Sequence, residues 1–293
     1  MTAKVTSSLK RLLPAPIRRP LGKLRAVAVR LSLWRKVQKN LSGACLEDTK
    51  ILTRSLRRAP ITVWRDLHAW QFPTVESDCI VISKGVGRFT VRGRTDDLFH
   101  VLPGQEPAVE ALVWECLREG DAFVDAGSNI GFYTILASRL VGSSGRVIAC
   151  EMMPVTASIL RSHVEMNGAA NVAVFEGALA ETGGEIVEAF FPEGKSGQSS
   201  LVRAGQGNSV MVQTLTLREV LADLSSVRLM KMDLEGAELG ALRGLGTDIH
   251  KVETIVMENR HDAEPLALLE ANGFKVSRLD GNNVIARRDA ARQ

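Results

Sequence analysis

The feature that most constrains the fold is a regular alternation of short apolar runs with helical patterns, from about residue 105 to the C-terminus. The runs AFVDAG, GRVIACE, NVAVFEGA, VRLMKMDLEG and KVETIVMEN read as strands, and segments of helical length separate them. This alternation predicts an α/β domain with a mostly parallel sheet that helices cover on both faces. FKVSRL and NVIARR predict a closing hairpin, and EIVEAFF and VMVQTLT an inserted pair of strands.

The N-terminal part of the chain differs from this domain in charge. Residues 1–60 contain 15 Lys and Arg but only two acids, a net charge of +13, whereas the rest of the chain has a net charge of −9. Helical patterns cover 21–41 and 47–58, the second closed by Pro60. We expect this extension either to contact an anionic surface such as a membrane, or to be a solvated helix pair whose apolar stripe packs on the body. Its Arg-rich composition also permits a transit peptide.

Residues 61–104 form a β-rich lead-in, in which CIVIS, GRFTVRG and DLFHVL predict a hairpin or meander. The predicted organisation is therefore a basic helical extension (1–60), this lead-in (61–104) and the α/β domain (105–293). The four cysteines include no close pair, which excludes a zinc ribbon. No apolar run approaches the ~20 residues of a membrane span, and no secretory signal is recognisable. We therefore expect a cytoplasmic protein, with peripheral membrane contact through residues 1–60.

The strongest motif is VDAGSNIG, in which an apolar strand ends at Asp125 and runs into a glycine turn. Gly127 permits a tight turn, Gly131 lets the next helix pack near the strand, and the amides at the start of that helix can face a polar ligand. The spacing is not the dinucleotide pattern G-x-G-x-x-G. Asp125 suits a ligand with a cationic amino or sulfonium group, and S-adenosylmethionine has both. An ordinary turn between strand and helix is the competing interpretation.

Two further sets of polar residues follow later strands of the predicted sheet. Glu151 ends the second strand, where an acid hydrogen-bonds ribose hydroxyls. In KMDLEGAE, alternation places Lys231, Asp233 and Glu235 on one face of a strand end. These acids can bind a substrate, hold a cofactor amine, accept a proton or coordinate a hard cation, but two acids alone do not predict a metal site.

Two other segments supply candidates for the acceptor side of the site. Glu258 and His261 follow the fifth strand, and His261 is the histidine best placed for a general base. The polar loop around Ser199 and Ser200 either covers the substrate or is a plain turn. Among these groups we expect Asp233, Glu235 or His261 to act as the general base, with Asp233 ranked first.

The order VDAGSNIGFYT, Glu151, SSL, KMDLEGAE and IVMEN resembles the FkbM family of S-adenosylmethionine-dependent methyltransferases, over roughly Glu106 to Arg288. The resemblance implies a Rossmann-like seven-stranded sheet with an antiparallel C-terminal hairpin, and O-methylation of a hydroxyl on a sugar or secondary metabolite. It departs from the family at Ser128, where Ala is usual, and leaves the basic extension unexplained. It places Asp125, Gly127, Asn129 and Gly131 around the methionine part of the cofactor, Glu151 at the ribose, Gly177 and Ala178 near the adenine, and Ser199, Ser200, Lys231, Asp233, Glu235 and Glu238 in or behind the active site.

A nucleic-acid methyltransferase anchored by the basic extension is the alternative function. The motifs N-P-P-[YF] and D-P-P-Y, which hold a flipped base, are absent, and the chain has a single Tyr for stacking. An NAD-dependent dehydrogenase lacks its G-x-G-x-x-G, and a non-enzymatic scaffold does not need an intact glycine turn. The sequence therefore favours a small-molecule or glycan hydroxyl as the acceptor.

Overall fold

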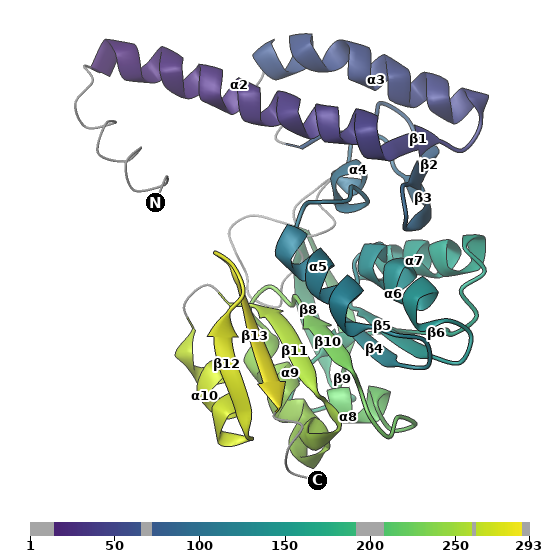
Figure 1. Ribbon diagram of the computed structural model, residues 1–293, viewed down its shortest axis with the longest axis vertical. Helices are drawn as coiled ribbons and strands as arrows, with labels where there is room; N and C mark the ends of the chain where they lie inside the picture. The colour runs from purple at the N-terminus through teal and green to yellow at the C-terminus, as the bar shows by residue number, and fades with distance from the viewer. Residues whose placement is uncertain (1–14, 66–71, 192–207, 260–261, 289–293) are drawn as a thin grey trace.

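The computed structural model describes residues 15–65, 72–191, 208–259 and 262–288 (Figure 1). Its centre is a seven-stranded sheet in the order β12-β13-β11-β10-β4-β5-β6, in which β13 alone runs antiparallel to the other strands. This confirms the predicted mostly parallel sheet and its closing hairpin. The strands are β4 (Ala122–Ala126), β5 (Arg146–Glu151), β6 (Val172–Glu176), β10 (Leu229–Met232), β11 (Thr254–Glu258), β12 (Phe274–Arg278) and β13 (Asn283–Arg288).

Alternate residues of the central strands face two separate apolar layers, as the period of two in a strand requires. Phe123 and Val147 point into the layer that α5, α6 and α7 cover. Val124 and Ile148 point into the layer that α8, α9 and α10 cover. The helices are α5 (Pro107–Cys116), α6 (Phe132–Val141), α7 (Pro154–Met166), α8 (Leu217–Val220), α9 (Glu238–Leu245), the 3-10 helix η2 (Gly246–Lys251) and α10 (Ala263–Ala271).

The predicted inserted strands form a small sheet of their own beside the main one. Strand β8 (Ile186–Phe191) pairs antiparallel with β9 (Asn208–Leu215), and β9 pairs with the short strand β7 (Ala178–Leu179). The insert continues directly from the end of β6, because Gly177 alone separates β6 from β7. A glycine is needed there, since a Cβ would come within 2.8 Å of the carbonyl oxygen of Gln213.

The N-terminal part contains two long helices and a three-stranded antiparallel sheet. Helix α2 (Ala15–Asn40) leads into β1 (Leu41–Gly43), which pairs with β2 (Cys79–Ser83), and β2 pairs with β3 (Gly87–Val91). Strand β1 was not predicted, because its three residues lie in what the sequence presents as a helix end.

Two predictions for this part are wrong, one about where a helix ends and one about the type of an element. Helix α3 (Leu46–Arg65) runs through Pro60 instead of stopping before it. Its buried residues Leu52, Ser55, Ala59 and Val63 continue at helical spacing past the proline, which itself is exposed, so packing outweighs the lost backbone hydrogen bond.

The second error concerns DLFHVL, which was interpreted as a strand. Its first four residues form the short helix α4 (Asp97–His100). Asp97 is fully buried, and its carboxylate accepts hydrogen bonds from the backbone and guanidinium of Arg92 at 2.7–3.0 Å. This paired, buried acid fixes a helical turn that hydrophobic alternation alone does not reveal.

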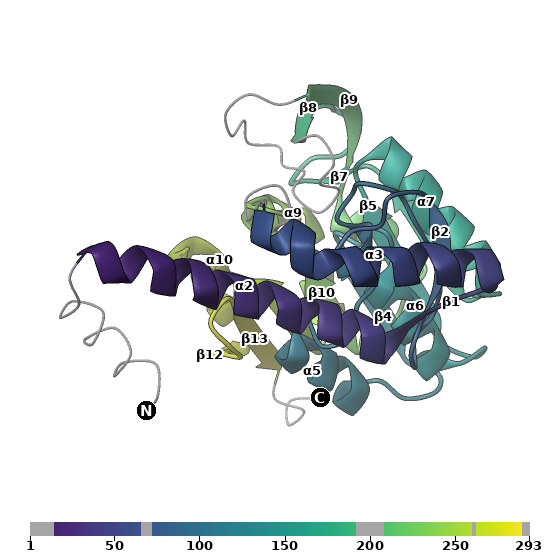
Figure 2. The same cartoon turned by 90° about the horizontal axis from the view of Figure 1, so that it is seen from above.

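The helical extension packs on the body of the protein, with no break in the core between them. Trp34, Val37 and Val63 belong to the same buried cluster as Phe89 and Phe123. Figures 1 and 2 show α2 and α3 side by side across one end of the molecule. Helix α4 and the N-terminal sheet of β1, β2 and β3 lie between them and the main sheet. The expectation that the helix pair packs on the body is therefore confirmed for α3 and for the C-terminal part of α2, whereas Leu24 and Ala28 of the predicted stripe are exposed.

Candidate active site

A cavity of about 340 Å³ opens at the carboxyl ends of β4, β5, β10 and β11. The strand order reverses between β4 and β10, because β5 and β6 continue to one side of β4 and β10 and β11 to the other. Such a reversal leaves a crevice, and ligands of open α/β sheets bind there. The size is typical of a small-molecule site.

The glycine turn after β4 forms one wall of this cavity. Gly127 has a φ of +84°, and a Cβ at this position would lie 2.0 Å from the carbonyl oxygen of Asp233. The ends of β4 and β10 can therefore approach each other only around a glycine. Gly131 has a φ of +92°, and the neighbour that excludes a side chain there is Leu160 of α7, rather than the strand that the sequence suggested.

Ser128 and Asn129 complete the turn. The hydroxyl of Ser128 is buried and donates to the carbonyl oxygen of Asp125 at 2.7 Å, so this departure from the usual Ala is satisfied internally. Asn129 adopts a left-handed conformation with a φ of 48°. Its backbone N–H donates to the carboxylate of Glu151 at 2.9 Å, which ties the turn to β5.

Asp125 lies at the base of the turn with 1% of its surface exposed. Its Oδ2 accepts a hydrogen bond from Thr134 at 2.6 Å, whereas its Oδ1 has no hydrogen-bond partner within the part of the chain that the structure describes. Burial raises the pKa of this carboxyl, and the charge of Lys231 opposes the rise. A buried acceptor atom beside a cavity, without a donor of its own, fits a cationic ligand group.

Glu151 is the second buried carboxylate of this wall. Its Oε1 accepts a hydrogen bond from the N–H of Met153 at 2.9 Å, so both of its oxygens are held by backbone amides. Burial raises its pKa to about 7, although these amides act in the opposite direction. Each oxygen keeps a second lone pair that can accept from a hydroxyl group. Gly177 and Ala178 line the same side of the cavity.

Lys231 lies in the middle of the site, on β10 beside Asp125 of β4. Its ammonium group is buried, 3.2 Å from a carboxylate oxygen of Asp233 and 5.1 Å from the ring centre of Tyr133. Burial opposes this charge, but the carboxylates of Asp233, Glu106 and Asp125 outweigh burial and raise the pKa of Lys231. The lysine is therefore a permanent cation among acids.

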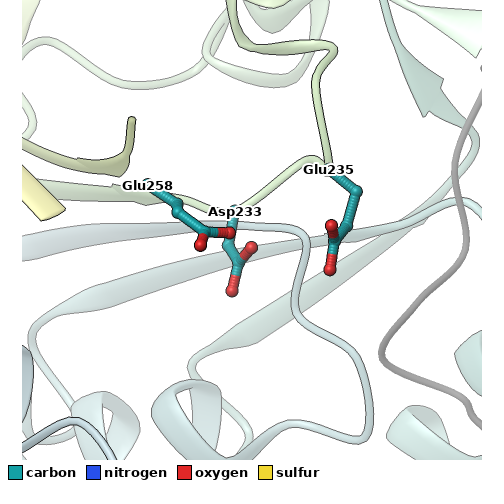
Figure 3. A group of neighbouring side chains, drawn as sticks. All are labelled: Asp233, Glu235 and Glu258. Carbon is teal, nitrogen blue, oxygen red and sulfur yellow. The ribbon is translucent and has the colours of Figure 1, made fainter. Parts of the chain in front are cut away.

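Three carboxylates converge where β10 and β11 end, as Figure 3 shows. One oxygen each from Asp233, Glu235 and Glu258 lies within 4.8 Å of the others. The structure thus adds Glu258 to the two acids that the sequence placed together. From sequence no metal site was predicted here, because only two of these three acids could be placed together.

Glu238 supports this loop instead of lining the cavity. Its two carboxylate oxygens accept hydrogen bonds from the backbone amides of Leu234 and Gly236 at 2.9 and 3.1 Å. The segment between β10 and α9 is therefore held in the shape that presents Asp233 and Glu235. Ser199, Ser200 and His261 lie outside the described residues.

The lead-in supplies a further wall of the cavity, which sequence reasoning did not place in the site. Phe72, Phe99 and His100 line the same cavity, and the two phenyl rings lie 4.4 Å apart. The Nε2 atom of His100 is 3.3 Å from the Oδ2 atom of the buried Asp96. A spacing of four residues places such a pair on one helix face, but the strand interpretation of DLFHVL concealed this signal.

The two walls are joined by a buried histidine of α7. His163 Nδ1 lies 2.7 Å from the carbonyl oxygen of Ile130 in the glycine turn, and Nε2 accepts a hydrogen bond from the N–H of Thr90 on β3. Burial lowers the pKa of this imidazole, and the two partners fix its neutral form with the proton on Nδ1. The lead-in is thereby fastened to the turn that it faces.

Comparison with known proteins identifies the family of this chain. The family model of the methyltransferase FkbM domain matches residues 125–276, about half of the chain. The chain belongs to the FkbM methyltransferase family. It is an S-adenosylmethionine-dependent methyltransferase, and the unpartnered oxygen of Asp125 fits the positive charge of that cofactor.

The chain is similar to methyltransferases of several organisms. "Methyltransferase 1" of Beauveria bassiana is 29% identical over 185 residues, which cover 54% of this chain and 74% of the fungal protein. The hexuronic acid methyltransferase AglP of Haloferax volcanii is 24% identical and aligns with 69% of this chain and 82% of its own. The crystal structure of the methyltransferase FkbM of Methylobacillus flagellatus aligns with 93% of this chain and 60% of its own, with 16% identity and a TM-score of 0.41.

Proposed function

We propose that this FkbM methyltransferase transfers the methyl group to a hydroxyl of an uncharged small molecule or glycan. The observation that supports this most is the charge of the cavity. Eight carboxylates line it against one lysine, with no arginine among the described lining residues. The carboxylates are Asp96, Glu106, Glu110, Asp125, Glu151, Asp233, Glu235 and Glu258. Such a cavity attracts a cationic cofactor and repels a phosphate or a uronate.

The cofactor and the acceptor would occupy opposite walls. Asp125 would accept from the amino group of the cofactor, Glu151 from its ribose hydroxyls, and Gly177 and Ala178 would contact the adenine. The turn Gly127–Gly131 would surround its methionine part. Once bound, the cofactor supplies an electrophilic methyl group on sulfur. The phenyl rings of the lead-in would pack against the apolar face of the acceptor.

We infer that His100 is the general base. Asp233, the first candidate from the sequence, already accepts a hydrogen bond from the Lys231 ammonium at 3.2 Å, so one of its oxygens is occupied. Asp96 beside Nε2 favours the tautomer that leaves Nδ1 of His100 free to accept a proton. His100 would take the proton of the acceptor hydroxyl during transfer of the methyl group that the bound cofactor would supply.

The proposed acceptor class is tested by methyl transfer from labelled cofactor. Neutral sugars and polyols are compared with the matching uronic acids, and with RNA as the acceptor of the alternative function. We expect labelled product only from uncharged acceptors. Preference for a uronate, or incorporation into RNA, would contradict the proposal. Calorimetric titration of S-adenosylhomocysteine, with NAD as the rival ligand, shows beforehand that the cofactor wall is intact.

A further inference from the structure

The outer face of α3 carries a stripe of basic and apolar residues that faces away from the core. Lys50, Arg54, Arg57, Ile61 and Trp64 recur at intervals of four, three, four and three residues, so they share one side of the helix. We call these five residues the outer stripe. All five are exposed, including 61% of Ile61 and 51% of Trp64, on the side opposite the buried residues of α3.

The charge of this surface is almost entirely positive. Helix α2 contains no acidic residue, and the two acids of α3 lie in its first turn. One of these, Asp48, is turned toward β2 and accepts a hydrogen bond from the N–H of Ile80. The other, Glu47, pairs with Lys50 at the exposed surface. Lys23 of α2 adds a further charge, because its ammonium lies 4.8 Å from the ring centre of Trp64.

We propose that the outer stripe docks on an anionic lipid bilayer. Lysines and arginines near such a surface bind the headgroups, while tryptophan and aliphatic side chains enter the boundary with the acyl chains. The exposed Ile61 favours a bilayer over a nucleic acid, because RNA offers an aliphatic side chain no apolar layer. No helix in the described part of the chain is long and apolar enough to cross a membrane, so the contact is peripheral. The proposal does not depend on the acceptor.

The test measures binding of the full chain to vesicles of phosphatidylcholine with about 30% phosphatidylglycerol, compared with phosphatidylcholine alone. We expect binding to the anionic vesicles only, weakened by added salt. The triple variant Lys50→Gln, Arg54→Gln, Arg57→Gln should bind about 100-fold more weakly, because each basic residue contributes about 1 kcal/mol. The matched control is Arg146→Gln, Arg218→Gln, Arg243→Gln, which removes the same charge from exposed positions of the α/β domain and should bind like the original protein.

A second pair of variants tests the apolar part. Trp64→Ser should lower vesicle affinity about tenfold, whereas Trp114→Ser, at a tryptophan of α5 with the same exposure, should leave it unchanged. Thermal unfolding of each variant shows that the fold is kept. Equal losses in both triple variants, or no binding of the original protein to anionic vesicles, would overturn the proposal. Binding to RNA without binding to vesicles would identify a nucleic acid as the partner. Since no cofactor or acceptor is present, failure here leaves the proposed methyl transfer untouched.

Discussion

At the level of the single residue, Glu151 both holds the glycine turn and lines the cavity. Its pKa of about 7 means that about half of the free protein carries a neutral carboxyl at neutral pH. A neutral carboxyl accepts a hydrogen bond from a hydroxyl group less well than a carboxylate does. Because the pKa is raised, the binding-competent anion is depleted as pH falls through 7.

Affinity for S-adenosylhomocysteine should therefore rise with pH. At pH 6 about a tenth of Glu151 is ionised, so the dissociation constant should be up to about tenfold larger than at pH 8. Calorimetry at pH 6, 7 and 8 measures this. Glu151→Gln should bind more weakly and with no such pH dependence. A slope that persists in this variant would show that another group titrates.

Two substitutions distinguish the two candidates for the general base, His100 and Asp233. His100→Gln should lower kcat by 10²–10⁴-fold, the usual contribution of a positioned base, with cofactor affinity within a few-fold of the original. His250→Gln, an exposed histidine far from the cavity, is the control. If Asp233→Asn abolishes turnover while His100→Gln does not, then Asp233 is the base.

Residue-scale reasoning from sequence succeeded where a motif and a strand end coincide. Asp125 and Glu151 end strands whose apolar pattern is continuous, so parallel pairing brings them together at one edge of the sheet. Phe72 and His100 reach the same cavity through contacts between distant segments, and no local pattern encodes such contacts. The grouping of Asp125 and Glu151 at one edge of the sheet could thus be predicted, whereas the place of Phe72 and His100 in the same cavity could not.

At the scale of elements, the glycine turn and the end of β10 interlock. Gly127→Ala should abolish cofactor binding, because its Cβ would collide with the backbone of Asp233. Gly184→Ala is a close control, because Gly184 has nearly the same φ, +83°, with open space around it. The control should lose only about 1–2 kcal/mol of stability from backbone strain. Cofactor titration and thermal unfolding distinguish the two, and equal effects would show that strain alone matters.

Elements were predicted well where hydrophobic period decides and poorly where pairing decides. The parallel strands, the inserted pair and the closing hairpin follow from apolar spacing. Strand β1 exists because it pairs with β2, and α3 passes Pro60 because its buried stripe continues to Val63. Both depend on tertiary contacts, which outweigh local propensity.

At the scale of the whole molecule, the helical extension shares the core of the α/β domain. Trp34→Ala should lower the free energy of unfolding by about 3–5 kcal/mol, the usual cost of emptying a buried aromatic site. Calorimetry should show one transition at a lower temperature. A separate early transition of the extension, with the main transition unchanged, would contradict a shared core. Deleting residues 1–44 would remove Trp34 and uncover the apolar core on which it packs. Point variants are therefore the cleaner test of membrane docking.

The close approach of Gly127 to Asp233 also bears on how the chain folds. These residues are separated by roughly a hundred positions, and the cavity wall that they share is complete only when β10 has docked beside β4. Contacts between such distant segments form late, since the loop between them must close first. Newly made chains would therefore gain the ability to hold a ligand in one step near the end of folding. A cofactor analogue added during refolding would then report completed molecules and ignore partly assembled ones.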